Sequence, residues 1–524
     1  MKKLLWMASV LACAGSVHAG PGRAAINAWM DSRSTTQVIQ GQIRVKVDAR
    51  LAARGYDAVS AANLVPGGAL SGRFGNLNWF VYSIDSSLDP VALATKLKRD
   101  SRIAWAEPVT EIKAYWTDPN DPDWGVDEMR DDYYFAVDED TIQRFERLHN
   151  LLDINAQAGW SVYPNTWFTA LTKPAHPPTI AVIDSGIDRD HPDFINAGGT
   201  SGDKANGGQI DWSRSRQIVE TVIGYPGDQN GHGTHVSGLA FAAGNNGEYA
   251  GFGMIGVGYS CQGTSYQIID ASGSGSDNDA VKAIIYAADH GADVINMSFG
   301  TTSNSLALQE ACTYAFQKGA VLVAAGNEAS SGTGLPPSYP AGCSGVLGVS
   351  SWVYGKQSIA QYSGPGNYID LGAPGGDYLQ DESFNLYFVY IHSTMPRYHV
   401  ALNDFTGLIV PIGQNYASLI GTSFAAPHVS GAAGTYMAKN GLERKGGWAN
   451  VRTMQALERG ADSPAAQWLP DRGFGLLDLE AALTDSNPRV AVNGAIEGIV
   501  YYGTPASNAK VTAKSRTSSY TKTT

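Results

Sequence analysis

Short apolar runs alternate with helical patterns through the middle of the chain, and this alternation restricts the possible folds more than any other feature. The runs predict strands at Thr179–Ile183, Tyr266–Asp270, Asp293–Met297, Ala320–Ala325, Val346–Val349 and Ile369–Leu371. The helical patterns cover His235–Ala243, Asn278–His290 and Ser305–Lys318. Such alternation predicts an α/β fold whose mostly parallel sheet is covered on both faces by helices. Ligand sites in such sheets gather at the carboxyl ends of the strands.

Ser423 comes just before a run of small residues that is typical of a tightly packed helix. Pro427 is tolerated only near a helix start, so we expect Ser423 in the first turn. The Ser423 hydroxyl would then lie beside unpaired backbone N–H groups, at the positive end of the helix dipole. This place favours an anion next to the hydroxyl, although an N-capping residue on an ordinary core helix is the alternative interpretation.

Three more polar residues occur at strand ends or at a helix start. Asp184 directly follows the first strand, and Asn327 closely follows another. His232 has a glycine on each side, which leaves its imidazole room to reach a partner. Together with Ser423 they supply a nucleophile, a base, a carboxylate to orient the base and an amide donor for an oxyanion.

Each of these motifs also has a simpler explanation. Asp184 and Asn327 are of residue types that are common in turns. His232 and His235 could share a metal ion, since they are three residues apart on a helix. However, no glutamate stands between them as in zinc metalloproteases, and no third ligand is evident.

Taken together and in chain order, the motifs resemble those of the subtilisin-like serine peptidases, the subtilase family. The matching residues are Asp184-Ser185-Gly186, His232-Gly233-Thr234-His235, Asn327 and Gly421-Thr422-Ser423. The resemblance implies a subtilisin-like three-layer α/β fold for a catalytic domain at 116–485. It also implies a secreted serine endopeptidase with an Asp184, His232 and Ser423 triad and an oxyanion hole that includes Asn327.

The same resemblance implies where a polypeptide substrate binds. Gly273-Ser274-Gly275 and Ser298-Phe299-Gly300 match the two family segments that hold an extended peptide between them by backbone pairing. Phe299 stands where the family usually has leucine, so we expect it to line the pocket for the residue before the cut. An apolar preference at that substrate position follows.

Residues 20–115 contain a small α+β unit. Alternation predicts strands near Ile43–Val47 and Val81–Ile84, followed by a helix at Pro90–Arg99 and a strand at Ile103–Pro108. This unit resembles the family's inhibitory propeptide, which implies a self-processing zymogen. Its tail would lie across the cleft until a cut between about residues 110 and 118 releases it.

Residues 1–19 have the pattern of a secretory signal peptide, with an apolar run from Leu4 to Ala12 and small residues ending at Ala19. We therefore expect a secreted protein, extracellular or periplasmic; a lipoprotein box ending at Cys13 is the alternative. No stretch is long and apolar enough to form a transmembrane segment. The net charge of −12 and the lack of a basic stripe argue against nucleic acid as a partner.

Three cysteines follow the signal, which is an odd number for an exported protein. Cys312 falls on a helix that leads into a strand, and Cys343 falls just before the next strand. We therefore expect a Cys312–Cys343 disulfide bond and a buried Cys261 outside any bridge.

The chemistry requires no cofactor, but the resemblance implies a possible structural calcium ion. Asp193 matches the family's ligand carboxylate, and Asn246 lies in the loop 244–247 that could supply further oxygen ligands. This loop is longer than usual, so a plain polar loop is the alternative; the effect of a chelator on the melting temperature distinguishes the two. The acidic segment 117–140 is interpreted as a solvated loop.

Two further segments carry no motif. Residues 377–415 are aromatic-rich without helical period, which predicts a loop or hairpin insertion near the site. Residues 486–524 are rich in Thr and Ser and predict a β-rich C-terminal extension.

The alternative to an enzyme is a catalytically silent subtilase fold that serves as a binding or surface module. The intact triad with Asn327 argues against that alternative.

Overall fold

A computed structural model gives the fold of much of the region between residues 38 and 523, and every structural statement below concerns those parts. The described residues are 38–55, 58–59, 62–74, 77–114, 149–163, 177–196, 198–218, 227–244, 254–326, 337–353, 358–360, 362–380, 386–404, 410–411, 415–444, 448–462, 468–486, 501–502, 504–505, 510–514 and 519–523. The expected signal peptide, the acidic segment 117–140, Asn246 and Asn327 therefore lie outside them.

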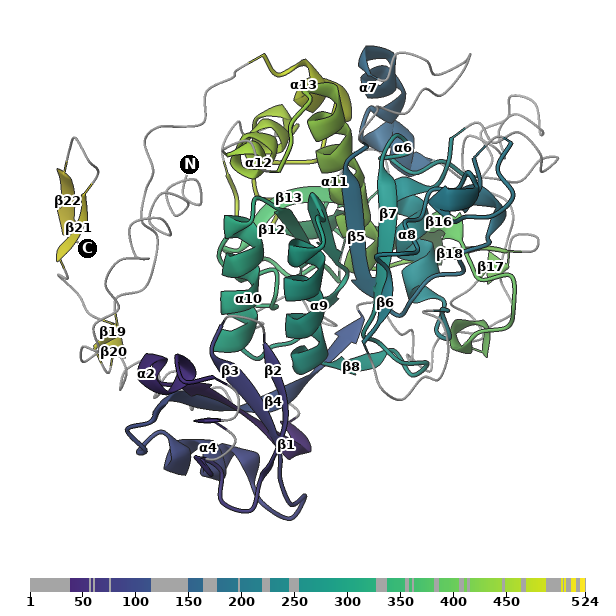
Figure 1. The fold of residues 1–524 in the computed structure, drawn as a ribbon. Coiled ribbons are helices and arrows are strands. Elements are labelled where there is room, and N and C mark those ends of the chain that lie inside the picture. Colours follow the sequence, from purple (N-terminus) through teal and green to yellow (C-terminus); the bar gives the residue numbers. More distant parts are fainter. Residues whose placement is uncertain are drawn as a thin grey trace.

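A seven-stranded sheet forms the centre of the molecule, with strand order β13-β12-β11-β9-β5-β7-β6 and every pairing parallel (Figure 1). Its strands are β5 (Thr179–Asp184), β6 (Arg216–Gln217), β7 (Gln262–Gln267), β9 (Val294–Met297), β11 (Val321–Ala325), β12 (Val346–Trp352) and β13 (Ile369–Pro374). Every residue of β5, β9, β11, β12 and β13 is buried, as expected for parallel strands covered on both faces.

Helices cover both faces of this sheet. The helices α9 and α10 pack against each other on the face that is in front in Figure 1, and α8 packs against α11 on the other face. The helices are α6 (His149–Asp153), α7 (Ala156–Val162), α8 (His232–Phe241), α9 (Asp277–Asp289), α10 (Leu306–Gln317), α11 (Thr422–Lys439), α12 (Ala449–Gly460) and α13 (Leu479–Thr484). The predicted three-layer α/β fold is confirmed.

Small residues let α11 pack closely against its neighbours. A Cβ atom added at Gly431 would lie 2.7 Å from the backbone nitrogen of Gly258, and one at Gly434 would lie 2.6 Å from Cys261 Sγ. Ser423 lies in the first turn of α11, as Pro427 and the run of small residues predict. The middle of α11 therefore packs closely against the segment before β7, and the helix also contacts β9, β11, β12 and β13.

Two elements begin earlier in the chain than the sequence predicted. The strand predicted at Tyr266–Asp270 is observed as β7 four residues earlier, because buried polar side chains such as Thr264 and Ser265 gave no apolar signal. The helix predicted from His235 begins at His232 instead. Both shifts arise where polar residues occupy buried positions, which periodicity cannot reveal.

The expected α+β unit forms an antiparallel sheet at the lower left of Figure 1, with strand order β4-β1-β3-β2. Its elements are β1 (Val38–Val47), α2 (Ala49–Ala52), β2 (Ala69–Phe74), β3 (Trp79–Ser83), α4 (Pro90–Leu97) and β4 (Ile103–Ala114). A separate apolar core that includes Ile43, Val45 and Leu97 holds it together. β2 was not predicted from the sequence.

The end of β4 extends out of this unit and pairs with two segments of the larger one. It pairs antiparallel with β8 (Ser274–Ser276) and with β10 (Phe299–Gly300). Lys113 is paired with Ser274 on one side and with Gly300 on the other. The last residues of β4 are therefore held as the middle strand between two strands of the central domain.

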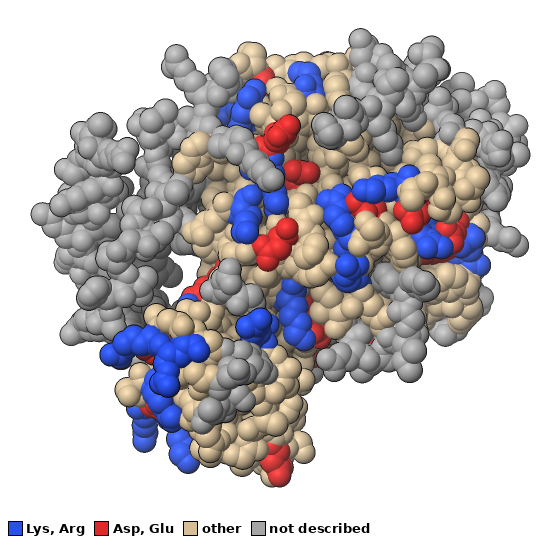
Figure 2. Space-filling view, in the orientation of Figure 1, with Lys and Arg blue, Asp and Glu red and all other residues tan. Residues whose placement is uncertain are grey.

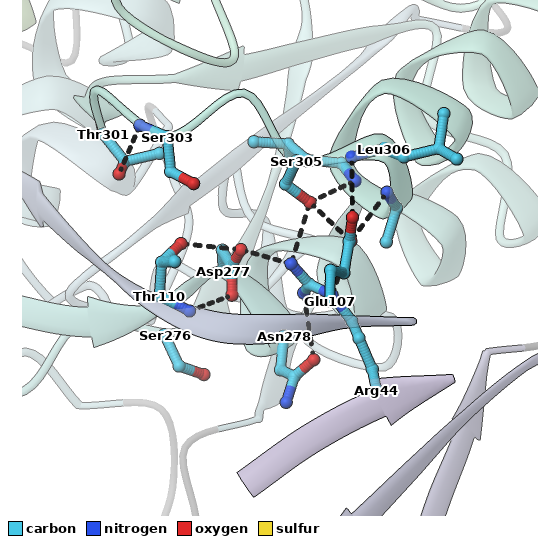
Figure 3. A network of polar contacts seen from close by, with 12 residues as sticks. Arg44, Glu107, Thr110, Ser276, Asp277, Asn278, Thr301, Ser303, Ser305 and Leu306 are labelled. Atoms are coloured by element: carbon cyan, nitrogen blue, oxygen red, sulfur yellow. Dashed lines mark hydrogen bonds and ion pairs between the residues drawn. The ribbon is translucent and has the colours of Figure 1, made fainter. Parts of the chain in front are cut away.

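A buried arginine joins the same two units (Figure 3). The side chain of Arg44, on β1, is fully buried; it donates to Glu107 Oε1 at 2.8 Å and to Asp277 Oδ2 at 2.5 Å. Ser305 Oγ accepts another hydrogen bond from it, at 2.8 Å. Burial acts to lower the pKa of Arg44, but Asp277 and Glu107 outweigh that effect and hold it above its ordinary value.

Glu107 also caps α10 across the interface. Its carboxylate accepts hydrogen bonds from the backbone N–H groups of Leu306 and Ala307, each at 3.2 Å. These are among the N–H groups that have no partner within the helix itself, and a carboxylate there is favoured by the helix dipole. The Arg44 network therefore ties the N-terminal unit to the first turns of α9 and α10.

The cysteine prediction is confirmed for Cys261, which is buried and outside any bridge, and wrong for the Cys312–Cys343 disulfide. Cys261, Cys312 and Cys343 are all buried thiols, and no Cys312–Cys343 bridge is formed in the structure. A disulfide requires Cα atoms closer than about 7 Å with Cβ atoms turned toward each other. Position relative to a strand does not fix that geometry, and the side chains of Cys312 and Cys343 instead form part of the large apolar core.

The segment 377–415 is an insertion of strands, as predicted. It contains the hairpin β14 (Asp377–Gln380) and β15 (Leu386–Val389), followed by β16 (Ile391–Thr394), the short helix η5 (Ala401–Asp404) and β17 (Val410–Pro411). β16 and β17 both pair with β18 (Tyr416–Leu419), and β16 packs against α8. The C-terminal extension contains the strands β19 (Tyr501–Tyr502), β20 (Thr504–Pro505), β21 (Lys510–Lys514) and β22 (Ser519–Thr523).

Charge is unevenly distributed over the face shown in Figure 2, where lysine and arginine gather on the N-terminal unit. The exposed basic residues of this unit include Arg50, Arg54, Lys96, Arg99 and Arg102. On the central domain the basic side chains lie among acidic ones (Figure 2). Among the helices that are described, none has the length and apolar character needed to span a bilayer.

Replacing Arg44 by alanine tests the importance of the buried network. The change leaves Glu107 and Asp277 buried without their shared cation, which costs about 3–5 kcal/mol when one partner of a buried pair is removed. We expect R44A to lower the melting temperature of the full-length chain, measured by calorimetry with Ser423→Ala also in place so that the chain stays uncut.

Arg50→Ala is the matched control in the same unit. The Arg50 side chain is 89% exposed and forms its ion pair with Asp48 at the surface, so its loss should leave the melting temperature nearly unchanged. Equal melting temperatures for R44A and R50A would contradict the importance of the network.

Candidate active site

The carboxylate of Asp184 and the imidazole of His232 meet at the carboxyl end of β5. His232 Nδ1 lies 2.8 Å from Asp184 Oδ1, and both side chains are buried. The Ser185 backbone N–H donates to the same oxygen at 2.7 Å, which holds the carboxylate in place. With Nδ1–H donated to Asp184, Nε2 becomes the nitrogen that can take up a proton.

Ser423 lies in the first turn of α11. Its hydroxyl donates to the carbonyl oxygen of Ser298 at 2.9 Å, and the Ser298 hydroxyl donates to the carbonyl oxygen of Ser423 at 2.7 Å. The ring of Phe424, the next residue, lies 5.4 Å from the imidazole of His232, measured between centroids. The fold thus gathers Asp184, His232 and Ser423 from three elements that are far apart in sequence.

Tight backbone packing fixes the start of α8. A Cβ atom at Gly233 would lie 2.3 Å from the carbonyl oxygen of Gly186, so only glycine fits between the helix and the turn after Asp184. The Gly233 N–H donates to Ser185 Oγ at 2.8 Å. The glycine that follows His232 therefore sets how closely the imidazole approaches the carboxylate.

Sequence reasoning missed Asp228, which organises the loop before His232. Its buried carboxylate accepts hydrogen bonds from the backbone N–H groups of Gly231 at 2.7 Å and Thr234 at 2.8 Å, and from the hydroxyl of Ser185 at 2.8 Å. Burial raises the pKa of the Asp228 carboxyl, and these hydrogen bonds oppose part of that rise. The only feature of the sequence that could have pointed to Asp228 is its place four residues before His232.

The second histidine of the motif, His235, has a different environment. Its Nε2 lies 3.2 Å from the carbonyl oxygen of Ala417, and burial lowers the pKa of His235 well below its ordinary value. The ring is therefore neutral and serves as a hydrogen-bond donor inside the core. Within the described stretches, no group of three or more His, Cys, Asp and Glu side chains could hold a metal ion.

The two proposed substrate segments lie on either side of the end of β4. Gly275 is paired with Ile112, and the carbonyl oxygen of Gly273 accepts a hydrogen bond from the N–H of Ala114 at 3.2 Å. Across β4, Phe299 is paired with Ala114 and is fully buried in the large apolar core. Ser274 and Gly300 are both paired with Lys113, and Ser298 comes directly before Phe299. The end of β4 is thus an extended peptide that already lies between the two segments.

The other predicted site residues are placed only in part. Asp193 is buried, and its Oδ2 accepts hydrogen bonds from the N–H of Met254 at 3.0 Å and from the hydroxyl of Tyr416 at 2.9 Å. Asn246, the other expected calcium ligand, and Asn327, the expected oxyanion donor, lie outside the described residues. Calcium binding and the role of Asn327 stay predictions.

Comparison of the sequence with known proteins gives a family model and several similar serine proteinases. A family model described as the subtilase family (peptidase S8) matches residues 176–476. The chain is 34% identical over 293 residues to a thermophilic serine proteinase of Bacillus sp. (strain AK1), covering 56% of this chain and 58% of that protein. It is 34% identical over 257 residues to thermitase of Thermoactinomyces vulgaris, covering 49% of this chain and 73% of thermitase.

Solved structures agree on the fold. Fervidolysin from Fervidobacterium pennivorans, a keratinolytic enzyme related to subtilisin, superposes with a TM-score of 0.60 at 23% identity, covering 86% of this chain and 62% of that one. The epidermin leader peptide processing serine protease of Staphylococcus aureus superposes with a TM-score of 0.58 at 20% identity, covering 86% of this chain and 99% of that one. The family model spans more than half of the sequence and contains Asp184, His232 and Ser423, so this chain belongs to the subtilase family.

Proposed function

We propose that the protein is a serine endopeptidase that hydrolyses polypeptides through an acyl-enzyme. The observation that carries the proposal is the 2.8 Å contact between His232 and Asp184 beside Ser423, at the end of a cleft that holds the extended strand β4. Membership of the subtilase family supports the same chemistry. The chain spans 58% of the length of the Bacillus proteinase, so activity of the whole protein is part of the proposal.

The geometry supports the following steps. Ser423 Oγ attacks the peptide carbonyl carbon while His232 Nε2 takes the hydroxyl proton. Asp184 holds the imidazole in the required tautomer and stabilises the cation that forms. The tetrahedral intermediate collapses, the C–N bond breaks, and His232 returns the proton to the leaving amine. Water then hydrolyses the acyl-enzyme by the same route in reverse.

The oxyanion of the intermediate needs donors, and we propose the Asn327 side-chain amide and the Ser423 backbone N–H. The start of α11 supports the second assignment, because the first turn lies at the positive end of the helix dipole, where a negative charge is favoured. Their positions at strand and helix ends would concentrate the donors where the negative charge develops.

We further propose that the N-terminal unit is an inhibitory propeptide and that the protein is secreted as a zymogen. The pairing of Ile112, Lys113 and Ala114 with the two segments occupies the backbone groups that a substrate would use. The last described pair joins Ala114 to Phe299, the neighbour of Ser298, whose carbonyl oxygen accepts a hydrogen bond from the Ser423 hydroxyl. Because the described end of β4 lies this close to Ser423, we propose a cut after the next residue in the sequence, Tyr115.

The assignment of Ser423 as the nucleophile is tested with a fluorophosphonate probe, which phosphonylates an activated serine and releases fluoride. We expect the purified mature protein to be labelled and to hydrolyse a casein substrate. Ser423→Ala should lose both, because no other group replaces the hydroxyl. A folded wild-type protein that takes no label would support the catalytically silent alternative.

Asn327→Ala tests the oxyanion donor. We expect kcat to fall by about 100- to 1000-fold while KM changes little, a magnitude measured in subtilisin itself for such a donor. The measurement is steady-state kinetics on a peptide substrate, with circular dichroism as the check on folding. An unchanged kcat in a folded variant would remove Asn327 from the mechanism.

Processing gives a separate prediction. Expressed in a host without other proteases, the wild-type chain should yield a mature form whose N-terminus, found by sequencing, is Trp116. The Ser423→Ala chain should stay uncut, since the cut is made by the active site itself. Efficient processing of Ser423→Ala, or a cut far from residue 115, would contradict this part of the proposal.

A further inference from the structure

The insertion after β16 lies directly on the loop that carries His232. The backbone N–H groups of Ala401 and Leu402 donate to the carbonyl oxygens of Gln229 and Asn230, each at 3.0 Å. In addition, the hydroxyl of Tyr398 accepts a hydrogen bond from the N–H of Asp228 at 3.1 Å. Three successive residues of the loop are therefore held by one short stretch of the insertion.

Apolar contacts close the remaining space at Gly231, the residue before His232. Its φ angle is +105°, a conformation that glycine adopts without cost. A Cβ atom there would lie 2.7 Å from Met395 Cε and 2.9 Å from Val400 Cγ2. The insertion thus packs against the backbone of the loop without a gap, so the loop cannot move outward past Gly231.

The same insertion also binds the turn that follows Asp184. Arg397 donates to both carboxylate oxygens of Asp188, from Nε to Oδ2 at 2.8 Å and from Nη2 to Oδ1 at 2.9 Å. The backbone N–H of Arg397 donates to Oδ2 as well, at 3.0 Å. Asp188 is 4% exposed, and a two-pronged arginine–carboxylate contact fixes distance and orientation together.

Asp188 is in turn connected to the first turn of α8. Its backbone N–H donates to Thr234 Oγ1 at 2.9 Å, and that hydroxyl donates to Asp228 Oδ2 at 2.7 Å. Thr394, on β16, donates from its hydroxyl to the carbonyl oxygen of Thr234 at 2.8 Å. One chain of polar contacts therefore runs from the insertion through the turn after β5 to the helix that begins with His232.

We propose that Arg397 is a positioning residue for the catalytic pair. Its contact with Asp188 holds the turn after Asp184 against the loop that carries His232, and so maintains the hydrogen bond between the two side chains. This inference rests on the proposed function. Arg397 itself does not contact the reacting groups; it acts through Asp188 and the insertion.

A small displacement is enough to make such a residue important. Catalytic groups that move by about 1 Å can lose roughly 100-fold in rate, because the reacting atoms no longer meet at attack distance. The Arg397 side chain is 42% exposed, but its partner Asp188 is buried, so losing Arg397 also lowers stability by leaving that carboxylate without its cation. The expected effect on turnover is therefore measured on folded protein, where the loss of stability does not contribute.

The test compares Arg397→Ala with the wild type at a temperature well below the melting temperature of both. The rate of fluorophosphonate labelling reports activation of Ser423 without any peptide binding, and steady-state kinetics separate kcat from KM. We expect R397A to lower the labelling rate and kcat by about 10- to 100-fold and to leave KM unchanged. Arg397→Lys keeps the positive charge but loses the paired N–H donors that reach both carboxylate oxygens of Asp188, so it should recover part of the rate.

Arg189→Ala is the matched control, because Arg189 follows Asp188 directly but its side chain, which is partly buried, pairs with Asp190 instead. The R189A variant should be labelled by the fluorophosphonate at the wild-type rate.

If Arg397 acts through Asp188, the labelling rate of the double variant R397A/D188A should fall no further than that of D188A alone. Tyr398→Phe, which removes one hydroxyl at an exposed position, should lower the labelling rate in the same direction and serves if R397A does not fold.

The outcomes separate this inference from the proposed function. Wild-type protein that takes no label contradicts the proposed function. Wild-type labelling with an equal rate for folded R397A, or for Tyr398→Phe where R397A fails to fold, overturns the positioning role alone. A change confined to KM would also overturn it, since that result indicates a contact with substrate rather than control of the Asp184–His232 pair.

Discussion

The hydrogen bond between His232 and Asp184 is the contact on which the proposed chemistry depends, and the architecture explains why it can form. Asp184 ends a fully buried parallel strand, so its carboxylate is fixed by the sheet. His232 begins the helix α8, whose position depends on the loop before it. A carboxylate held by a rigid strand and an imidazole held by a loop need additional contacts that set the distance between them. Asp228 provides such contacts within the loop, and the insertion provides others from outside it.

The sequence predicted what periodicity and chain order control. The alternation of strands and helices gave the sheet, and Pro427 with the small residues after it gave the helix that begins near Ser423. It did not give the pairing of charges that are distant in the chain. Arg44 and Asp277 are 233 positions apart, and nothing local to either residue indicates the other. The disulfide prediction failed for the same reason, because the geometry between two elements is set by their packing and not by their order.

The N-terminal unit uses two kinds of contact with the central domain, and they differ in chemistry. β4 adds a backbone strand between β8 and β10, which any extended peptide could do. Arg44 and Glu107 instead place charges against the first turns of α9 and α10. Burying those charges is unfavourable unless every one has a partner, so this second contact depends on exact fit and discriminates against other chains. The unit thus combines general pairing in the cleft with specific docking outside it.

The insertion shows how a polar network can control geometry where apolar packing cannot. The loop before His232 contains Gly231, and a glycine has no side chain that could pack into an apolar core. Its conformation is therefore set by hydrogen bonds to its backbone and by the side chains that close on it from the insertion. Each of these contacts is individually weak, but Arg397 joins the insertion to Asp188, so the loop and the turn after β5 are held by one connected set of polar contacts. A rigid unit of this kind keeps the imidazole and its carboxylate together, because displacing either one requires breaking several hydrogen bonds at once.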